Sequence, residues 1–173
     1  MPEPLKFHLC DTDRGWVGLV FSPHGLRATT LLSASRDEAM RRVMEMGAVE
    51  PASDADLADI PERIRALASG RYANLALHID WDGITSFRRA VLEETMRIPA
   101  GETRSYGWLA ARVGRPRAAR AVGRVMATNP LPLVVPCHRV VGSDGGLTGY
   151  GGGLAMKETL LRAEGASWRA DVR

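Results

Sequence analysis

The sequence is poor in cysteine, contains no long hydrophobic run and lacks acidic residues over one long stretch. Only Cys10 and Cys137 occur among its 173 residues, too few for the disulfide framework of a small secreted domain. No apolar run approaches the ~18–20 residues of a membrane-spanning helix, and the N-terminus lacks a signal-peptide pattern. We therefore expect a cytoplasmic protein of bacterial or archaeal type (nuclear if eukaryotic), with no membrane partner.

Metal-binding patterns are lacking as well. His8 and Cys10 are two residues apart, but His24 and His78 fall at no recognisable ligand spacing. Structural or surface roles are the more ordinary explanation for these four side chains. We expect no metal site and no cofactor.

Acidic side chains are absent between Glu102 and Asp144, a stretch that is rich in arginine. The net charge is −4 over residues 1–85 and +7 over residues 86–173. A long stretch of one sign is a candidate surface for a polyanion. A solvated basic face is the alternative, but alanines and glycines interleave the arginines in a helical pattern, unlike a disordered basic tail. The arginines of this stretch are Arg104, Arg112, Arg115, Arg117, Arg120, Arg124 and Arg139.

Hydrophobic periodicity and turn residues predict two parts, with a boundary near Asp82-Gly83. Residues 1–84 predict an α/β domain, and residues 85–173 a mainly helical one. In the first part we expect strands over 5–9, 16–21, 25–32 and 75–79, a helix capped by Ser35, and one helix over 54–69. In the second we expect helices over 87–97, 105–113, 117–128 and 154–164, capped at the first two by Ser86 and Ser105, and a strand over 133–135.

Two of these helices flank Gly114-Arg115-Pro116 and fit a helix-turn-helix, although helix pairs with glycine turns are common. The second helix begins with Ala118-Ala119-Arg120-Ala121-Val122-Gly123. Its small residues would let the backbone lie close to a sugar-phosphate surface, from which Arg120 would project. A helix that reads base edges would instead display Asn, Gln and several arginines. This pattern favours close, sequence-tolerant contact with DNA.

The stretch Pro136-Cys137-His138-Arg139 joins a thiol to an imidazole, the pair that forms a reactive thiolate. Neighbouring side chains on an extended chain point opposite ways, so a water molecule could relay the proton. Glu164, in the last helix, is a candidate to orient the imidazole. A buried, inert thiol is the ordinary alternative.

The stretch from Gly142 to Gly153 is glycine-rich and contains Tyr150. A flexible connector is the simple interpretation. Bare backbone beside an aromatic ring can also form one wall of a pocket for a flat ring. No phosphate-binding loop pattern is present.

Taken together, "SYGWLA", "RAARAVG", "NPLPLVVPCHRVVG" and "LTGYGGGLAMKETLLRAEG" resemble the O6-alkylguanine-DNA alkyltransferases, the methylated-DNA–protein-cysteine methyltransferase family. The resemblance is dense from Ile98 to Gly165 and looser from Ile84. Before residue 84, only the order of strands and helices is similar to the ribonuclease-H-like N-terminal domain of the family.

The resemblance implies a role for each candidate residue. Cys137 would accept the alkyl group, His138 would take its proton through water, and Glu164 would orient the imidazole. Tyr106 would protonate or hydrogen-bond the leaving guanine, and Asn129 would tie the recognition helix to the active-site strand. The guanine would be bound by the backbone at Cys137, Val140 and Gly151 and by the side chains of Met126, Pro132 and Tyr150. The DNA-binding set would be Arg120, as a finger filling the space of the flipped nucleotide, with Ala119, Ala121, Gly123, Ser105, Arg115 and Arg117.

The sequence departs from the family at a few positions. Gly151 stands where some relatives carry serine, which removes a side-chain donor but keeps the backbone one. The segment Ile84-Thr85-Ser86-Phe87-Arg88 and Leu92 also differ from the usual pattern, and these changes affect packing of the first helix.

The expected activity is direct repair of O6-alkylguanine, and of O4-alkylthymine, in double-stranded DNA by base flipping. The alkyl group would pass irreversibly to Cys137, once per protein, without a cofactor and in a monomer. A non-catalytic sensor of alkylated DNA is the main alternative, but such proteins carry tryptophan at the position of Cys137. A cysteine hydrolase or thiol redox enzyme is a second alternative. It would not need the arginine-rich helices, and no Cys-x-x-Cys motif is present.

Overall fold

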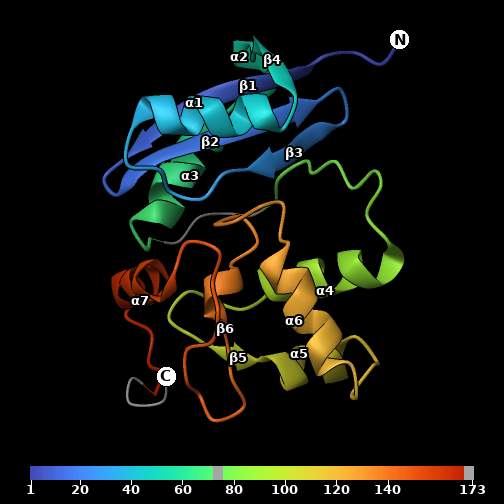
Figure 1. Ribbon diagram of the computed structural model, residues 1–173, viewed down its shortest axis with the longest axis vertical. Helices are drawn as coiled ribbons and strands as arrows, with labels where there is room; N and C mark the ends of the chain where they lie inside the picture. Colours follow the sequence, from blue (N-terminus) through green and yellow to red (C-terminus); the bar gives the residue numbers. More distant parts are fainter. Residues whose placement is uncertain (72–75, 170–173) are drawn as a thin grey trace. The chain divides into compact units, whose positions relative to one another are not determined.

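The computed structural model describes residues 1–71 and 76–169, and the chain forms two compact units (Figure 1). The first unit contains Met1–Asp82 together with Pro130–Val134, and the second contains Gly83–Asn129 and the chain from Val135 onward. A short segment of the second half of the sequence therefore belongs to the first unit. Each unit is described by itself below.

The first unit is built on a mixed sheet in the order β3-β2-β1-β4. Strands β1 (Leu5–Thr12), β2 (Gly15–Ser22) and β3 (Gly25–Thr29) are antiparallel neighbours, and β4 (Ala48–Pro51) pairs parallel to β1. Helix α1 (Arg36–Glu45) connects β3 to β4, while α2 (Asp54–Leu57) and α3 (Ile60–Ala68) follow β4. This is the expected α/β arrangement.

Helices cover both faces of this sheet, α1 on one side and α3 on the other (Figure 1). Successive residues of a strand point to opposite faces. On the α1 side, a Cβ added at Gly18 would lie 2.3 Å from Val43 Cγ1, so the absence of a side chain lets α1 approach β2 closely. On the α3 side, Cys10 is fully buried and its thiol lies 3.5 Å from the carbonyl oxygen of Pro61.

Three expectations for this unit need correction. The single helix over 54–69 is wrong, because the chain breaks at Ala58, whose φ of 43° lies outside the helical region. Strand β4, over Ala48–Pro51, is not among the strands that the sequence predicted. The strand over 75–79 is reduced to one bridge between Leu26 and Ile79, and Leu75 lies outside the described residues.

The second unit is mainly helical, as expected. Its helices are α4 (Ser86–Met96), α5 (Tyr106–Arg112), α6 (Ala119–Ala127) and α7 (Leu154–Ala163). Two short strands, β5 (Arg104–Ser105) and β6 (Val140–Val141), pair in parallel. This pairing ties the start of α5 to the segment that follows Cys137, because Tyr106 comes directly after β5 and Cys137 shortly before β6.

Two local predictions in and beside this unit are wrong. Helix α4 is capped by Thr85 and not by Ser86, since the Thr85 side chain accepts from the backbone N–H of Arg88. Residues 133–135 form no strand. Leu133 has a φ of 72° and lies in a turn, and Cys137–Arg139 then form one turn of 3₁₀ helix. Within the described part of the chain, no helix has the length and apolar character to cross a membrane.

Candidate active site and nucleic-acid interface

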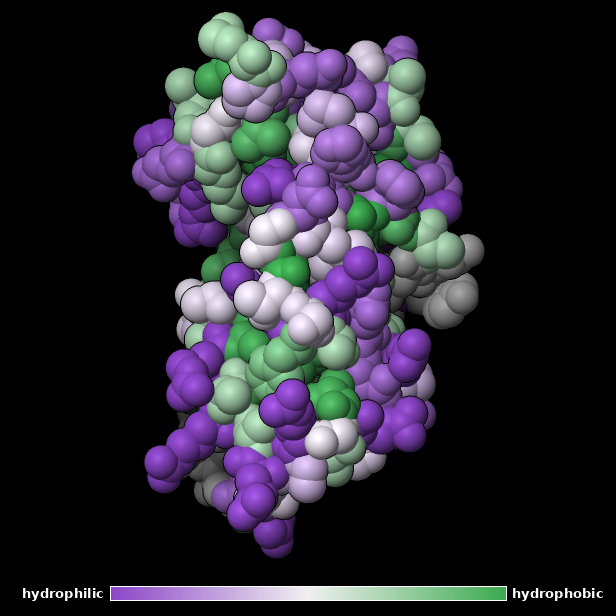
Figure 2. Space-filling view, turned by 90° about the vertical axis from the view of Figure 1, so that its right-hand side faces the viewer, coloured by the Kyte–Doolittle hydropathy of each residue, from purple (hydrophilic) through white to green (hydrophobic). Residues whose placement is uncertain are grey.

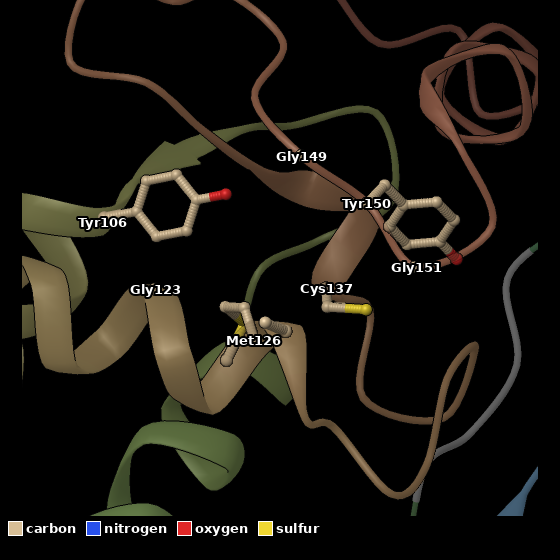
Figure 3. Close-up of a pocket in the computed structure, with 8 residues that line it drawn as sticks. Tyr106, Gly123, Met126, Cys137, Gly149, Tyr150 and Gly151 are labelled. Atoms are coloured by element: carbon tan, nitrogen blue, oxygen red, sulfur yellow. The ribbon is translucent and has the colours of Figure 1, made fainter.

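A cavity of about 400 Å³ lies within the second unit and reaches Cys137 (Figure 3). Its size is within the range of small-molecule sites. Cys137 and Tyr150 lie on one side and Tyr106 on the other, with Met126 between them in the view (Figure 3). The cavity is lined by Tyr106, Gly123, Met126, Ala127, Cys137, Gly149, Tyr150 and Gly151. The fold therefore brings the Cys137 thiol, two tyrosine rings and the backbone of several glycines together around one cavity.

The thiol is held by the short 3₁₀ helix that begins at Cys137. The Cys137 backbone N–H donates to Val135 O at 2.7 Å, and the Arg139 N–H donates to Pro136 O at 2.9 Å. Pro136 has no backbone N–H that would need a hydrogen-bond acceptor, which suits the residue before such a turn. Cys137 is only 7% exposed, so its thiol is reached through the cavity.

His138 and Glu164 meet as the sequence predicted. His138 Nε2 lies 2.8 Å from Glu164 Oε1, and both side chains are 2% exposed. Arg139 Nε and Nη2 donate to the two oxygens of the same carboxylate at 2.9 and 2.7 Å. Burial alone would raise the pKa of Glu164, but the hydrogen bonds and charges of His138 and Arg139 lower it to about 2. The carboxylate is therefore ionised and fixes the imidazole.

The other imidazole nitrogen of His138, Nδ1, is buried and has no hydrogen-bond partner among the described residues. Burial lowers the pKa of His138, and this outweighs the opposing effect of Glu164. The imidazole is therefore neutral at physiological pH. With its Nε2–H donated to the carboxylate, Nδ1 carries a free lone pair and can accept a proton.

The thiol itself is not a ready-made thiolate. Burial raises the pKa of Cys137, opposed by a hydrogen bond from Asn129 and by the positive charge of Lys157. An unshifted thiol is already mostly protonated at neutral pH. The proton must therefore leave as the sulfur reacts, and a neutral base beside it meets that need.

Asn129 and Tyr106 are both anchored close to the cavity. Asn129 lies just after α6 and donates from Nδ2 to Val135 O at 2.9 Å, which ties the end of that helix to the turn before Cys137. The Tyr106 hydroxyl lies 2.8 Å from Thr148 Oγ1, in the glycine-rich loop. Burial raises the pKa of Tyr106, so this phenol keeps its proton at neutral pH.

Two predicted binding residues do not line the cavity. Pro132 belongs to the segment that is grouped with the first unit and is not among the residues that line the cavity, so its predicted contact with guanine stays a prediction. The carbonyl oxygen of Val140 already accepts a hydrogen bond from Lys157 Nζ at 2.6 Å. Met126, Tyr150 and Gly151 do line it.

The predicted DNA-binding residues lie on α5, on α6 and in the turn between them. Ser105 caps α5 by accepting from the Trp108 N–H at 3.0 Å. Ala119, Ala121 and Gly123 are half-buried on α6. The side chains of Arg115, Arg117, Arg120 and Arg124 are exposed and make no hydrogen bond or ion pair with the described residues. Figure 2 views the side on which α4, α5 and α6 lie in Figure 1 and shows hydrophilic side chains around paler and apolar residues there.

Sequence reasoning missed three residues of this site: Arg139, Thr148 and Lys157. The signal for Arg139 was present, since it stands beside His138 in the same motif. Thr148 and Lys157 gave no local signal, because a threonine in a glycine loop and a lysine on a helix are ordinary surface residues. Trp108, on α5, is 36% exposed, and the guanidinium groups of Arg104 and Arg112 lie over its ring at 5.3 and 5.5 Å from the centroid.

The second unit thus combines a buried thiol that lines a cavity, a neutral base next to it in the chain, and four exposed arginines that have no partner among residues 1–71 and 76–169. Such a site suits a nucleophilic protein that acts on a polyanion. Residues 86–166 match the family described as the 6-O-methylguanine DNA methyltransferase, DNA binding domain.

Named relatives extend this match to the first unit. The chain is 40% identical over 146 residues to the methylated-DNA–protein-cysteine methyltransferase of Mycobacterium leprae, covering 84% of this chain and 85% of that protein. It is 48% identical over 103 residues to the protein of the same name from Mycolicibacterium paratuberculosis, covering 60% of this chain and 62% of that protein. The crystal structure of Mycobacterium tuberculosis OGT in complex with DNA is similar with a TM-score of 0.74, at 32% identity and 92% coverage of each chain. The chain belongs to the methylated-DNA–protein-cysteine methyltransferase family.

Proposed function

We propose that this protein repairs O6-alkylguanine in double-stranded DNA by transferring the alkyl group to Cys137. It is a methylated-DNA–protein-cysteine methyltransferase that reverses the damage directly. The main support is one observation: a buried thiol meets a cavity beside a neutral imidazole that a carboxylate holds at 2.8 Å. O4-alkylthymine, which carries an alkyl group on an equivalent exocyclic oxygen, is a second substrate.

The transfer balances with the groups present. The Cys137 thiol gives its proton through a water molecule to His138 Nδ1, and the sulfur attacks the alkyl carbon. The new S–C bond forms as the C–O6 bond breaks, and the electron pair of the broken bond stays on guanine. The Tyr106 hydroxyl donates a proton to the leaving guanine, and the proton on His138 later restores that hydroxyl through solvent. The products are S-alkylcysteine and guanine.

The thioether product is stable, and no second cysteine lines the cavity to remove the alkyl group. Each molecule therefore acts once. A cysteine hydrolase would instead need a water that regenerates the thiol, and an alkyl thioether offers no carbonyl for such a water to attack. A sensor of alkylated DNA would need the cavity but not a base beside a thiol.

The alkyl group of a stacked base is inaccessible, so the nucleotide must rotate out of the duplex at a cost of about a few kcal/mol. Arg120 is the candidate to fill the vacated space, because it is long, exposed and flanked by Ala119 and Ala121. Arg115 and Arg117 would attract the phosphates without entering the stack.

The domain assignment follows the same proposal. Residues 85–173, apart from the Pro130–Val134 segment that belongs to the first unit, form the alkyltransferase domain, with α5 and α6 as a helix-turn-helix. Residues 1–84 form a ribonuclease-H-like domain, supported by the strand order β3-β2-β1-β4 with β4 parallel to β1. The protein acts as a monomer on DNA that contains the alkylated base.

Cys137→Ser tests the acceptor. The variant and the wild type are incubated with duplex DNA that carries a radiolabelled methyl group on guanine O6. We expect one label per wild-type molecule and none on the variant, with DNA binding retained because the arginines are unchanged. Label on the Cys137→Ser protein would exclude Cys137 as the acceptor.

Arg120→Ala tests the finger. The variant should slow repair of duplex DNA much more than reaction with free O6-alkylguanine base, which needs no flipping. Arg115→Ala and Arg117→Ala are the controls for phosphate attraction, whose loss weakens binding and changes its salt dependence. Equal slowing of Arg120→Ala on both substrates, or full rescue by saturating DNA, would contradict this role.

A further inference from the structure

Thr148, in the glycine-rich loop, is exposed, yet its hydroxyl lies 2.8 Å from the Tyr106 hydroxyl. Within the part of the chain that the structure describes, Thr148 is the one hydrogen-bond partner of that phenol. Tyr106 extends from the start of α5 with its hydroxyl directed toward the side of the cavity that carries Gly149 and Cys137 (Figure 3). The contact therefore joins the loop to α5 through the hydroxyl that we propose as the proton donor to guanine.

The fold holds the Thr148 hydroxyl in this place. The preceding residue, Leu147, is 5% exposed and anchors the loop, and the Thr148 carbonyl oxygen accepts from Lys157 Nζ at 3.1 Å. The methyl group of Thr148 lies over Gly142, where an added Cβ would be 3.4 Å from Thr148 Cγ2. Because the methyl and the hydroxyl share one Cβ, fixing the first also fixes the direction of the second.

Tyr106 is held on its own side of the contact. It directly follows β5, whose pairing with β6 fixes the backbone, and Ser105 caps the helix that Tyr106 begins. Its ring passes Gly123 of α6, where an added Cβ would be 3.9 Å from Tyr106 Cδ1. Both hydroxyls are therefore placed by the fold, and neither depends on a long, flexible side chain.

The direction of this hydrogen bond decides what Tyr106 can do. A phenol carries one proton, which it can give either to Thr148 or to a base in the cavity. When Thr148 is the donor, the Tyr106 proton is free for the base. The phenol oxygen gains negative charge as that proton leaves, and hydrogen bonds to a charged oxygen are the stronger ones. Burial raises the pKa of Tyr106, and the hydrogen bond with Thr148 opposes this rise.

We propose that Thr148 is a positioning residue for proton transfer to the leaving guanine: it donates to the Tyr106 oxygen, aims the phenol proton at the base and stabilises the phenolate as that proton leaves. The inference rests on the alkyltransferase function proposed above. The Tyr106 O–H bond breaks as a new bond to hydrogen forms on guanine, while the Thr148 O–H bond stays intact. The phenolate then regains a proton from His138 through solvent, as in the transfer described above.

Two substitutions separate the hydroxyl of Thr148 from its shape. Thr148→Val keeps the methyl group over Gly142 and removes the hydroxyl, whereas Thr148→Ser keeps the hydroxyl and removes the methyl group. Thr159→Val is the matched control, because Thr159 is exposed on α7 and its hydroxyl donates to Ala155 O at 2.8 Å. Tyr106→Phe removes the phenol hydroxyl through which Thr148 is proposed to act.

The first measurement is the rate of reaction with free O6-benzylguanine base over a range of base concentrations, with the Cys137 product followed by mass spectrometry. Thr148→Val should lower the maximal rate about tenfold, the effect of losing one hydrogen bond to a group that gains charge. The half-saturating concentration should stay nearly unchanged, because Thr148 acts on Tyr106 and not on the base. Thr148→Ser should restore most of the rate, and Thr159→Val should match the wild type.

Iodoacetamide serves as a second reagent for Cys137, because its iodide leaves without needing a proton. Its rate should be the same in the wild type, Thr148→Val and Thr159→Val. If Thr148 only kept the loop in place, Thr148→Val would instead raise the half-saturating concentration of the base or change the iodoacetamide rate. Either result would overturn the proposal.

A double-mutant cycle tests whether Thr148 acts through Tyr106. In the Tyr106→Phe background, Thr148→Val should cause no further loss of the benzylguanine rate. The same tenfold loss with and without the phenol hydroxyl would show that Thr148 acts on another group, and the proposal would be wrong.

A third measurement needs no alkylated base. In protein labelled with carbon-13 at tyrosine Cζ, the Tyr106 resonance is identified by its loss in Tyr106→Phe. It should shift in Thr148→Val and keep its position in Thr148→Ser and Thr159→Val. An unshifted resonance in Thr148→Val would overturn the proposal, whatever the reaction rates. Failure of the proposed function would differ, because the wild type would leave the alkylguanine unreacted while the Tyr106 resonance still responded to Thr148.

Discussion

Replacing Glu164 with glutamine removes the negative charge that His138 and Arg139 share. The glutamine oxygen can still accept one hydrogen bond, but Arg139, which is 4% exposed, loses its ionic partner and keeps only the carbonyl oxygen of Ile98. Leaving one charge of a buried pair uncompensated typically costs about 3–5 kcal/mol. We therefore expect Glu164→Gln to destabilise the second unit strongly.

The pKa of Glu164 gives an independent magnitude. It falls from the ordinary 4.5 to about 2 in the folded protein, and its side chain is 2% exposed. At about 1.4 kcal/mol per pH unit, this corresponds to about 3 kcal/mol of stability. Because the folded-state pKa is the lower one, this stability is complete above pH 4.5 and is lost as the pH falls through 2.

The assay is urea unfolding followed by circular dichroism at pH 7 and pH 3. The wild type should exceed Glu164→Gln by about 3 kcal/mol at pH 7, and the gap should shrink to about half at pH 3. Glu158→Gln is the control on the same helix, where Glu158 pairs with Arg162, a side chain that is 65% exposed; it should cost less than about 1 kcal/mol. Equal stability of wild type and Glu164→Gln at pH 7, or a gap that acid does not change, would refute the reasoning.

Three further predictions concern other positions. Cys10→Ser should leave the transfer rate unchanged, measured with labelled duplex DNA, because Cys10 contacts no base; a large loss in a folded protein would contradict this. Asn129→Ala should slow transfer at least tenfold in the same assay, since it removes the hydrogen bond to the Val135 carbonyl and the hydrogen bond to the Cys137 thiol. An unchanged rate would exclude a role of Asn129 in positioning Cys137. Gly18→Ala should destabilise the first unit by about 1–3 kcal/mol in thermal unfolding, because the new methyl would overlap Val43; an unchanged melting temperature would show that α1 shifts freely.

Two of the three predicted helix caps are confirmed, and the third, Ser86, is replaced by its neighbour Thr85. Ser35 and Ser105 cap helices where the pattern predicted, because a cap depends only on the next few residues. Strand β4 was missed because its partner β1 is distant in the chain and Pro51 resembles a loop residue. The apolar run Leu133–Val135 fits a strand or a buried turn equally well, and only tertiary contacts decide between them.

The functional site, too, could be predicted from the sequence only in part. Glu164 was only a candidate partner of His138 until the family resemblance implied the pairing, because no spacing along the chain places a residue of the last helix beside the motif. Lys157 could not be found that way. Its partners are backbone carbonyls, which carry no sequence signature, and only the fold brings two of them to one ammonium.

The segment Pro130–Val134 has a consequence for the order in which the chain can fold during synthesis. It completes the first unit, where Thr29 donates from its backbone N–H to Pro130 O at 2.9 Å and from its hydroxyl to Pro132 O at 2.7 Å. A ribosome that has made only the first 84 residues therefore holds an N-terminal unit without its last segment. That unit is finished when Val134 emerges, three residues before the nucleophile, so its maturation and the delivery of Cys137 fall at nearly the same moment of translation.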